Sequence, residues 1–344
     1  MKEKEKIILD VDTGSDDAIA IVCALLSDEL EVLGITTVGG NVELKNTTDN
    51  TLRVVECCGK GGEVGVYMGS ELPLVSTLVP WGIQGMTLPR KEERFNQKVR
   101  VHPQHLPLPE TSLRPEEKRA AHWLVEKLIS MPDHSVTLVP VGPQTNISLA
   151  IRTDDRILKK IKRVVMMGGS HDHYAPTQGA EFNVWCDPEA VEILLTSGLD
   201  VTMVSLDATS HAVLNREQAQ AIRAIGTAPA KLVADMIEQR LDASEKVLKG
   251  AEGQVVGAAL HDPLAVCAVT HPEVLKDVRF TSCHVDLGRG YAYGETVLGR
   301  NYYGREDENG VVVSLPPNCH YAASADPELF YDWLYGILKN AAKK

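Results

Sequence analysis

The sequence is short of basic residues, of paired cysteines and of long apolar runs. Its 344 residues contain 35 Lys+Arg against 47 Asp+Glu, which gives a formal net charge of −12. So acidic a surface repels phosphate backbones, and we therefore expect no nucleic-acid partner without a local basic patch. The densest basic stretch, residues 89–100, also carries Glu92 and Glu93. We interpret it as a solvated loop.

The seven cysteines are scattered and no CxxC pair occurs, so neither a disulfide framework nor a zinc ribbon is indicated. The longest apolar run, Ala18–Leu26, is too short to span a membrane. The first six residues carry both signs of charge and lack the apolar stretch of a signal peptide. We therefore expect no membrane association and a reducing, cytoplasmic location.

Short β-like runs alternate with longer helical ones along most of the chain. The strand-like runs are Lys6–Val11, Leu30–Val38, Glu63–Tyr67, Ser135–Val139, Arg163–Met167 and Asp200–Ser205. The helical runs are Ala18–Leu26, Thr47–Cys58, Pro115–Met131, Pro188–Thr196 and Pro327–Leu338, with a further helix beginning at Asn146–Ile151. This alternation predicts the α/β class, with an open, mainly parallel, Rossmann-like sheet and helices on both faces.

A chain of this length can form one large α/β domain or two small ones. No linker divides it and no internal repeat is visible, so we expect one domain over residues 1–344. The irregular segment at about 82–115, rich in proline and charge, is predicted to be an inserted loop. Ligands of open α/β sheets bind at the carboxyl ends of the strands, which directs attention to the strand-to-helix turns.

Four carboxylates follow the first expected strand, in the sequence DVDTGSDD. Asp10 and Asp12 share one face of an extended strand, Gly14 is expected to permit a tight turn, and Asp16 and Asp17 begin the helix. The helix macrodipole accounts for acidic residues in a first helical turn, but not for two carboxylates at the end of an apolar strand. Crowded carboxylates in a low-dielectric cleft repel one another, and a hard divalent cation would relieve that repulsion.

Two reaction classes fit such a loop. One is phosphoryl transfer on an aspartyl nucleophile with Mg²⁺, as in phosphatases of the haloacid-dehalogenase type. The other is metal-assisted hydrolysis, in which a carboxylate and a cation together activate water.

A second acidic position lies far along the chain, where His261 and Asp262 precede Pro263. An Asp before a Pro is a common helix N-cap, and we accept that interpretation for Asp187. For Asp262 both roles, cap and metal ligand, stay open. His261 favours a functional role because it can donate a proton near neutral pH.

Three further turns offer polar atoms. Glu181 and Asn183 present acceptors and an amide of the kind that polyhydroxylated ligands need, and Asn41 adds an amide at a strand end. The strand before Val141 leaves into a Gly/Pro turn, where the Val141 carbonyl would be free to meet a cation.

These segments resemble the inosine-uridine preferring nucleoside hydrolase family, whose signature DxDxGxDD matches DVDTGSDD. Six further motifs follow in that family's order: TTVGGN (36–41), VGPQTNI (141–147), VMMGG (165–169), EFNVWCDPE (181–189), LDAT (206–209) and HDPLAV (261–266). The phosphatase alternative is weakened, because it has no use for the EFN segment or for the HD pair.

The resemblance implies hydrolysis of the N-glycosidic bond of ribonucleosides to free base and ribose, in a homodimer or homotetramer. It implies a Ca²⁺ held by Asp12, Asp17, the Val141 carbonyl and Asp262, with Asp12 as the base for the Ca²⁺-bound water. His261 would be the acid that protonates the leaving base, and Asp10 would hydrogen-bond to the turn. The expected ribose contacts are Asp16, Asn41, Met167, Glu181 and Asn183.

The chain departs from the family pattern near the base. Trp81 and Gln84 stand where a His and an Asp are expected, and Ala175 stands where many members have Asn. Val141 replaces a usual Thr, which is harmless for a main-chain ligand. The base preference therefore stays open, and so does an alternative function, a nucleoside- or ribose-binding protein with weak or no turnover.

Overall fold

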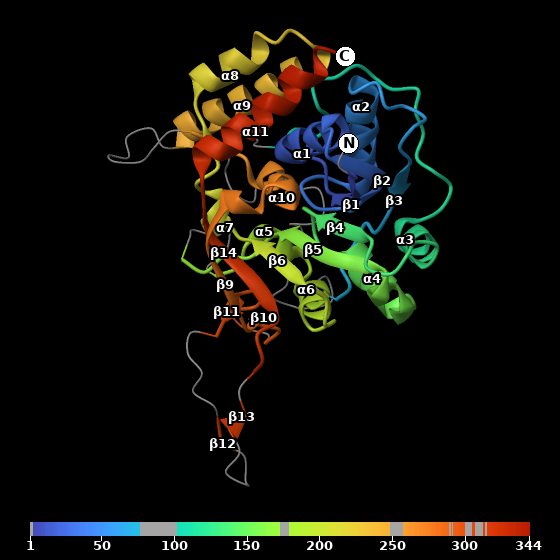
Figure 1. The fold of residues 1–344 in the computed structure, drawn as a ribbon, viewed down its shortest axis with the longest axis vertical. Coiled ribbons are helices and arrows are strands. Elements are labelled where there is room, and N and C mark those ends of the chain that lie inside the picture. The colour runs from blue at the N-terminus through green and yellow to red at the C-terminus, as the bar shows by residue number, and fades with distance from the viewer. Residues whose placement is uncertain are drawn as a thin grey trace.

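The computed structural model describes residues 3–75, 102–172, 179–247, 257–288, 290, 292–299, 305–306, 312–313 and 315–344. Its centre is an eight-stranded sheet in the order β3-β2-β1-β4-β5-β6-β14-β9 (Figure 1). The strands are β1 (Glu5–Val11), β2 (Leu30–Thr37), β3 (Val66–Met68), β4 (Val136–Pro140), β5 (Ile161–Met167), β6 (Val201–Val204), β9 (Leu275–Thr281) and β14 (Cys319–Ala325). All neighbours pair parallel except β9, which is antiparallel to β14.

Helices cover both faces of this sheet, as the sequence predicts (Figure 1). They are α1 (Ser15–Leu26), α2 (Leu44–Cys57), α3 (Ala120–Ile129), α4 (Thr145–Thr153), α5 (Phe182–Cys186), α6 (Pro188–Leu195), α7 (Leu206–Thr209), α8 (Arg216–Arg223), α9 (Ala228–Val247), α10 (His261–Thr270) and α11 (Pro327–Ala341). Three two-stranded sheets lie outside the main one: β7 (Val213–Leu214) with β8 (Ala258–Ala259), β10 (Cys283–Val285) with β11 (Thr296–Leu298), and β12 (Arg305–Glu306) with β13 (Val312–Val313).

The alternation of side chains along β1 explains the two layers of helices. Ile7 and Leu9 pack into one core cluster with residues of α1, α9 and α10, whereas Ile8 packs into the other with residues of α3, α4 and α6. A strand that is covered on both faces has to be apolar throughout. Residues 7–9 of β1 are all apolar, as this requires. In α1, Ala18 to Leu25 are all buried, because the helix lies between the sheet and its neighbours.

The expected α/β class with a mainly parallel sheet is confirmed, but some boundaries are wrong. The helix expected from Pro115 begins at Ala120, because the preceding segment runs beside β3, where the Glu116 N–H donates to the Val66 carbonyl at 2.8 Å. Helices α8 and α9 were not expected. In the inserted loop, residues 102–115 form neither helix nor strand, and the earlier residues of that loop lie outside the described ranges.

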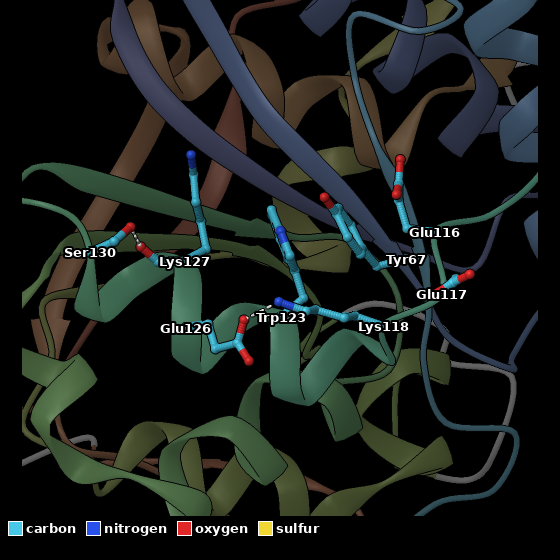
Figure 2. A pocket seen from close by; sticks show the side chains of 8 residues that line it. All are labelled: Tyr67, Glu116, Glu117, Lys118, Trp123, Glu126, Lys127 and Ser130. Atoms are coloured by element: carbon cyan, nitrogen blue, oxygen red, sulfur yellow. Dashed lines mark hydrogen bonds and ion pairs between the residues drawn. The ribbon is translucent and has the colours of Figure 1, made fainter.

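A groove of about 640 Å³ lies beside β3 and α3 (Figure 2). The rings of Tyr67 and Trp123 stack there with centroids 4.0 Å apart, and Lys118 pairs with Glu126. Gly34 of β2 leaves room for this stack, since a Cβ there would lie 2.5 Å from the Trp123 ring. None of the groove's lining residues is one of the expected site residues.

The strand order reverses beside β1, because β2 and β3 lie on one side of it and β4 to β6 on the other. In open α/β sheets, ligands bind outside the carboxyl ends of the strands at such a reversal. Asp10 of β1 pairs with Pro140 of β4, so the turns that follow these two strands open next to each other. Among the described residues, no helix is both long and apolar enough to cross a membrane.

Candidate active site

The acidic turn after β1 folds back on itself through its own backbone. The N–H groups of Asp12 and Gly14 donate to the Asp17 carboxylate at 3.1 and 2.9 Å. Asp17 thus satisfies backbone donors at the start of α1, a task that a cap side chain commonly performs. Gly14 itself has φ −102°, outside the left-handed region that favours glycine. Gly14 is needed for space instead, because a Cβ there would lie 2.2 Å from Nδ1 of His102.

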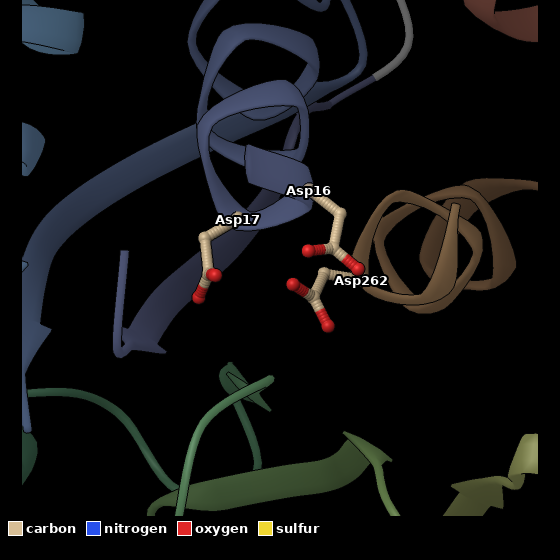
Figure 3. A group of neighbouring side chains, drawn as sticks. All are labelled: Asp16, Asp17 and Asp262. Carbon is tan, nitrogen blue, oxygen red and sulfur yellow. The ribbon is translucent and has the colours of Figure 1, made fainter. Parts of the chain in front are cut away.

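Two helix starts that lie far apart in the sequence meet at this turn. Asp16 and Asp17 at the start of α1 and Asp262 at the start of α10 each offer a carboxylate oxygen within 4.8 Å of the others (Figure 3). All three residues are buried. Helix α10 begins at His261 and its N-cap is Leu260, so Asp262 is not the cap that one interpretation of the sequence made it. Asp187, by contrast, does cap α6, accepting from the Ala190 N–H at 3.2 Å.

Asp12 lies directly beside this group. Its Oδ2 accepts from the Asn41 N–H at 2.6 Å, whereas its buried Oδ1 makes no hydrogen bond with any described residue. Two glycines allow this close packing: a Cβ at Gly40 would lie 2.1 Å from Oδ2, and one at Gly142 would lie 3.0 Å from Oδ1. An uncompensated buried carboxylate oxygen is costly, so this oxygen is suited to a positively charged or hydrogen-bonding ligand.

The electrostatics of the group show the same deficit of positive charge. Burial, together with repulsion from neighbouring carboxylates, raises the pKa of Asp12 and Asp262 well above the ordinary value. The same two causes raise the pKa of Asp17 to about 6. Asp16 differs: burial alone would raise its pKa, but the charge of Arg240 beside it brings the pKa below the ordinary value.

Asn41 connects the turn after β2 to both neighbouring carboxylates. Its backbone N–H donates to Asp12, and its Nδ2 donates to Oδ2 of Asp17 at 3.1 Å. Asp10 lies deeper, where Thr36 and Asn146 donate to its Oδ1 at 2.5 and 2.8 Å and burial raises its pKa to about 7. Asp10 is thus held by the neighbouring strand β2 and by α4.

The far side of the site is formed by β4, β5 and α5. The Asn183 amide donates to the Val141 carbonyl at 2.7 Å and to the Met167 carbonyl at 3.3 Å. Glu181 is the N-cap of α5 and accepts from the backbone N–H groups of Gly169, Asn183 and Val184. Its burial raises its pKa to about 7. These contacts bring the four residues expected here, Val141, Met167, Glu181 and Asn183, into one network.

His261 lies next to Asp262 at the start of α10. Its Nδ1 is 2.8 Å from Oγ1 of Thr209 at the end of α7, a contact that fixes the orientation of the ring. The charge of His261 contributes to lowering the pKa of Asp16, which places the imidazole close to the acidic group.

The family model for inosine-uridine preferring nucleoside hydrolases matches residues 7–332 of the chain. The chain belongs to this family. It is 33% identical to the pyrimidine-specific ribonucleoside hydrolase RihA of Escherichia coli over 338 residues, 97% of this chain and 98% of the other. It is 34% identical to the inosine-uridine preferring nucleoside hydrolase of Crithidia fasciculata over 345 residues, 99% of this chain and 98% of the other.

Solved structures of nucleoside hydrolases have the same fold as this chain. A plant nucleoside hydrolase superposes with a TM-score of 0.83 at 24% identity, covering 97% of this chain and 99% of the other, which supports the fold. A purine-preferring ribonucleoside hydrolase from Gardnerella vaginalis gives a TM-score of 0.80 at 26% identity, covering 98% and 99%. The protein is therefore a ribonucleoside hydrolase, an enzyme that cleaves N-glycosidic bonds, and its substrates are ribonucleosides.

Two residues of this nucleoside hydrolase site escaped the sequence analysis. Arg240 of α9 reaches Asp16 and Ser15, and His102, just after the undescribed part of the inserted loop, accepts from the Ser15 N–H through Nδ1 at 3.2 Å. Neither belongs to a motif, and both reach the site only through tertiary packing. Gly14 was the one local signal, because its missing side chain makes room for His102.

The residues present suit a hard cation such as Ca²⁺. The carboxylates of Asp12, Asp17 and Asp262, whose pKa values are raised, and the buried Val141 carbonyl are all oxygen donors, the ligand type that Ca²⁺ prefers. A buried, mutually repelling set of this kind is stabilised by positive charge. Trp81, Gln84 and Ala175, the departures near the base, lie outside the described residues.

Proposed function

We propose that this nucleoside hydrolase binds Ca²⁺ through Asp12, Asp17, the Val141 carbonyl and Asp262, with Asp12 also serving as the catalytic base. The observation that carries the proposal is the buried Oδ1 of Asp12, which has no hydrogen bond with a described residue and lies beside carboxylates at the starts of α1 and α10. When bound, Ca²⁺ would supply positive charge and Lewis acidity to the attacking water.

The protein's own groups then divide the work of breaking the bond between ribose C1′ and the base. The Asp12 carboxylate accepts a proton from the water that attacks C1′. As the glycosidic bond breaks, positive charge develops on the sugar. Fixed carboxylates at Asp16 and Glu181 stabilise that charge, because they are held in place before the reaction begins.

The ribose is held by groups that the fold has already oriented. Asp16 and Asn41 approach from the β1 and β2 turns, whereas Met167, Glu181 and Asn183 approach from the β5 side. Because Asn183 is fixed by the Val141 and Met167 carbonyls, its position is coupled to that of an expected cation ligand.

His261 would protonate the departing base. Its Nδ1 is in contact with Thr209, so in the protonated ring Nε2 would be the nitrogen that donates to the leaving nitrogen heterocycle. A base that leaves as an anion is a poor leaving group, which is why a proton donor accelerates the reaction.

A panel of nucleosides scored for released ribose, with and without a chelator, tests this proposal. We expect ribose release that chelator abolishes and Ca²⁺ restores, and the panel also ranks inosine, uridine, adenosine and cytidine. Tight inosine binding without ribose release would identify a nucleoside-binding protein instead. Full activity in chelator would refute the cation's role.

We also propose three properties that accompany this function. The family resemblance supports a homodimer or homotetramer. The scattered positions of the cysteines in the sequence and the absence of CxxC pairs support a reducing cytoplasm. The unbroken alternation of strands and helices supports a single domain over residues 1–344.

A further inference from the structure

One cation of the protein's own lies in the acidic site. The guanidinium of Arg240, on α9, donates through one nitrogen to Oγ of Ser15 at 2.9 Å and to Oδ1 of Asp16 at 3.0 Å. Arg240 is only 8% exposed and Asp16 only 3%, so solvent screens this pair weakly. A buried arginine that contacts two adjacent residues fixes the first turn of α1 from outside the β1–α1 unit.

The pairing divides the acidic group into two kinds of carboxylate. Asp17 is bonded to the backbone of its own turn and to Asn41, and Asp12 has one oxygen without a partner. Among the described residues, Asp16 is the one member of the three-carboxylate group that has an ion pair with an arginine or lysine. It already has a positive charge beside it, so it gains least from an added cation.

We propose that Arg240 is a positioning residue that reserves Asp16 for the ribose hydroxyls and keeps it out of the cation's ligand set. This inference rests on the proposed function, since it assigns the two tasks to different carboxylates of that site. Distances alone do not separate the ribose-binding carboxylate from the cation ligands, because oxygens of Asp16, Asp17 and Asp262 lie within 4.8 Å of one another. The ion pair with Arg240 does, because it engages Oδ1 of Asp16 directly.

The alternative is a purely structural role, in which Arg240 only ties α9 to α1. The chain offers a control for that role in Arg223 of α8, which is bound to the same helix through Asp235 and Glu238 at 2.7 and 2.9 Å. Arg223→Met removes a tether of α9 without touching any residue of the site.

The test compares Arg240→Lys, which keeps the charge, with Arg240→Gln and Arg240→Met, which lose it. Steady-state kinetics with a nucleoside give KM and kcat, and calorimetry of the cation-free protein with Ca²⁺ alone gives the cation affinity. For the charge-losing variants we expect KM to rise about tenfold, the effect of losing one charge-assisted hydrogen bond, with a much smaller change in kcat. We expect their Ca²⁺ affinity to rise, by roughly tenfold, because a like charge has left and Asp16 becomes available as a ligand.

In Arg240→Lys, both KM and the Ca²⁺ affinity should be close to the wild-type values. Arg223→Met should change neither of them. Combining Arg240→Met with Asp16→Asn should raise KM no further than Asp16→Asn alone, because the arginine acts through that carboxylate. If Arg240→Met does not fold, the contrast between Arg240→Lys and Arg240→Gln carries the same test.

A KM unchanged in the charge-losing variants, or a Ca²⁺ affinity that is unchanged or falls, would overturn the positioning role. Failure of the proposed function has a different signature, since the wild-type protein itself would then bind no Ca²⁺ or release no ribose.

Discussion

Removing divalent cations should make the stability of the protein strongly dependent on pH. In the cation-free protein the pKa of Asp17 is raised from 3.8 to about 6, and those of Asp12 and Asp262 are raised as well. A carboxyl group whose pKa is higher in the folded than in the unfolded state binds its proton more tightly when folded. The free energy of unfolding then falls as pH rises through the interval between the two pKa values.

The size of the effect follows from the shift. Each pH unit between the ordinary and the raised pKa corresponds to about 1.4 kcal/mol, so Asp17 alone accounts for a loss of about 3 kcal/mol. That loss develops as pH rises from about 4 to about 6, and it is a large part of a typical total stability of about 5–15 kcal/mol. Bound Ca²⁺ offsets it, because protons and the cation compete for the same oxygens.

Urea unfolding at a series of pH values, in chelator and in saturating Ca²⁺, measures the effect. The gain from Ca²⁺ should be small near pH 5 and grow toward pH 7.5, reaching about 2.7 kcal/mol when Ca²⁺ is at a hundred times its Kd. Glu181 and Asp187 also have raised pKa values, about 7 and about 6, but they lie outside the proposed ligand set. They should lower stability with pH in both series, so the difference between the series isolates the cation site. A difference that does not change with pH would refute the reasoning.

Three substitutions test the assigned roles by steady-state kinetics. Asp12→Ala should lower kcat about a thousandfold, within the range for loss of a general base, and wild-type turnover would contradict the mechanism. Asn41→Ala keeps the backbone donor to Asp12 but loses the amide, so KM should rise about tenfold with kcat less affected; the reverse pattern would argue against a ribose contact. His261→Ala should lower kcat about a hundredfold for nucleosides and far less for 4-nitrophenyl riboside, whose leaving group needs no proton. Equal losses on both substrates would remove His261 as the acid.

The parts of the fold that the sequence predicts well are those with strong local patterns. The apolar runs of β1, β2, β4, β5 and β6 mark strands covered on both faces, and their alternation with helices predicts the parallel sheet. The start of α3 was misplaced because Pro115 is a common first helical residue. Here the backbone of Glu116 is instead bonded to β3, a tertiary contact with no local signal.

In the candidate site, too, the residues with a local sequence pattern could be predicted and those brought in by tertiary packing could not. The DVDTGSDD segment places its carboxylates within one turn, so their proximity is visible in the sequence. The meeting of Asp17 with Asp262 could be expected only from the family resemblance. Arg240 was missed because it belongs to no motif and its helix was not expected, and only the packing of α9 against α1 brings it to Asp16.

A crystal structure with Ca²⁺ and ribose bound would test the central claim most directly, since that claim concerns which oxygens hold which ligand. We expect Ca²⁺ about 2.3–2.6 Å from oxygens of Asp12, Asp17, Val141 and Asp262, with Asp16 bound to the ribose hydroxyls and still paired with Arg240. A cation coordinated by Asp16 in place of Asp12, or bound away from Asp17 and Asp262, would contradict it.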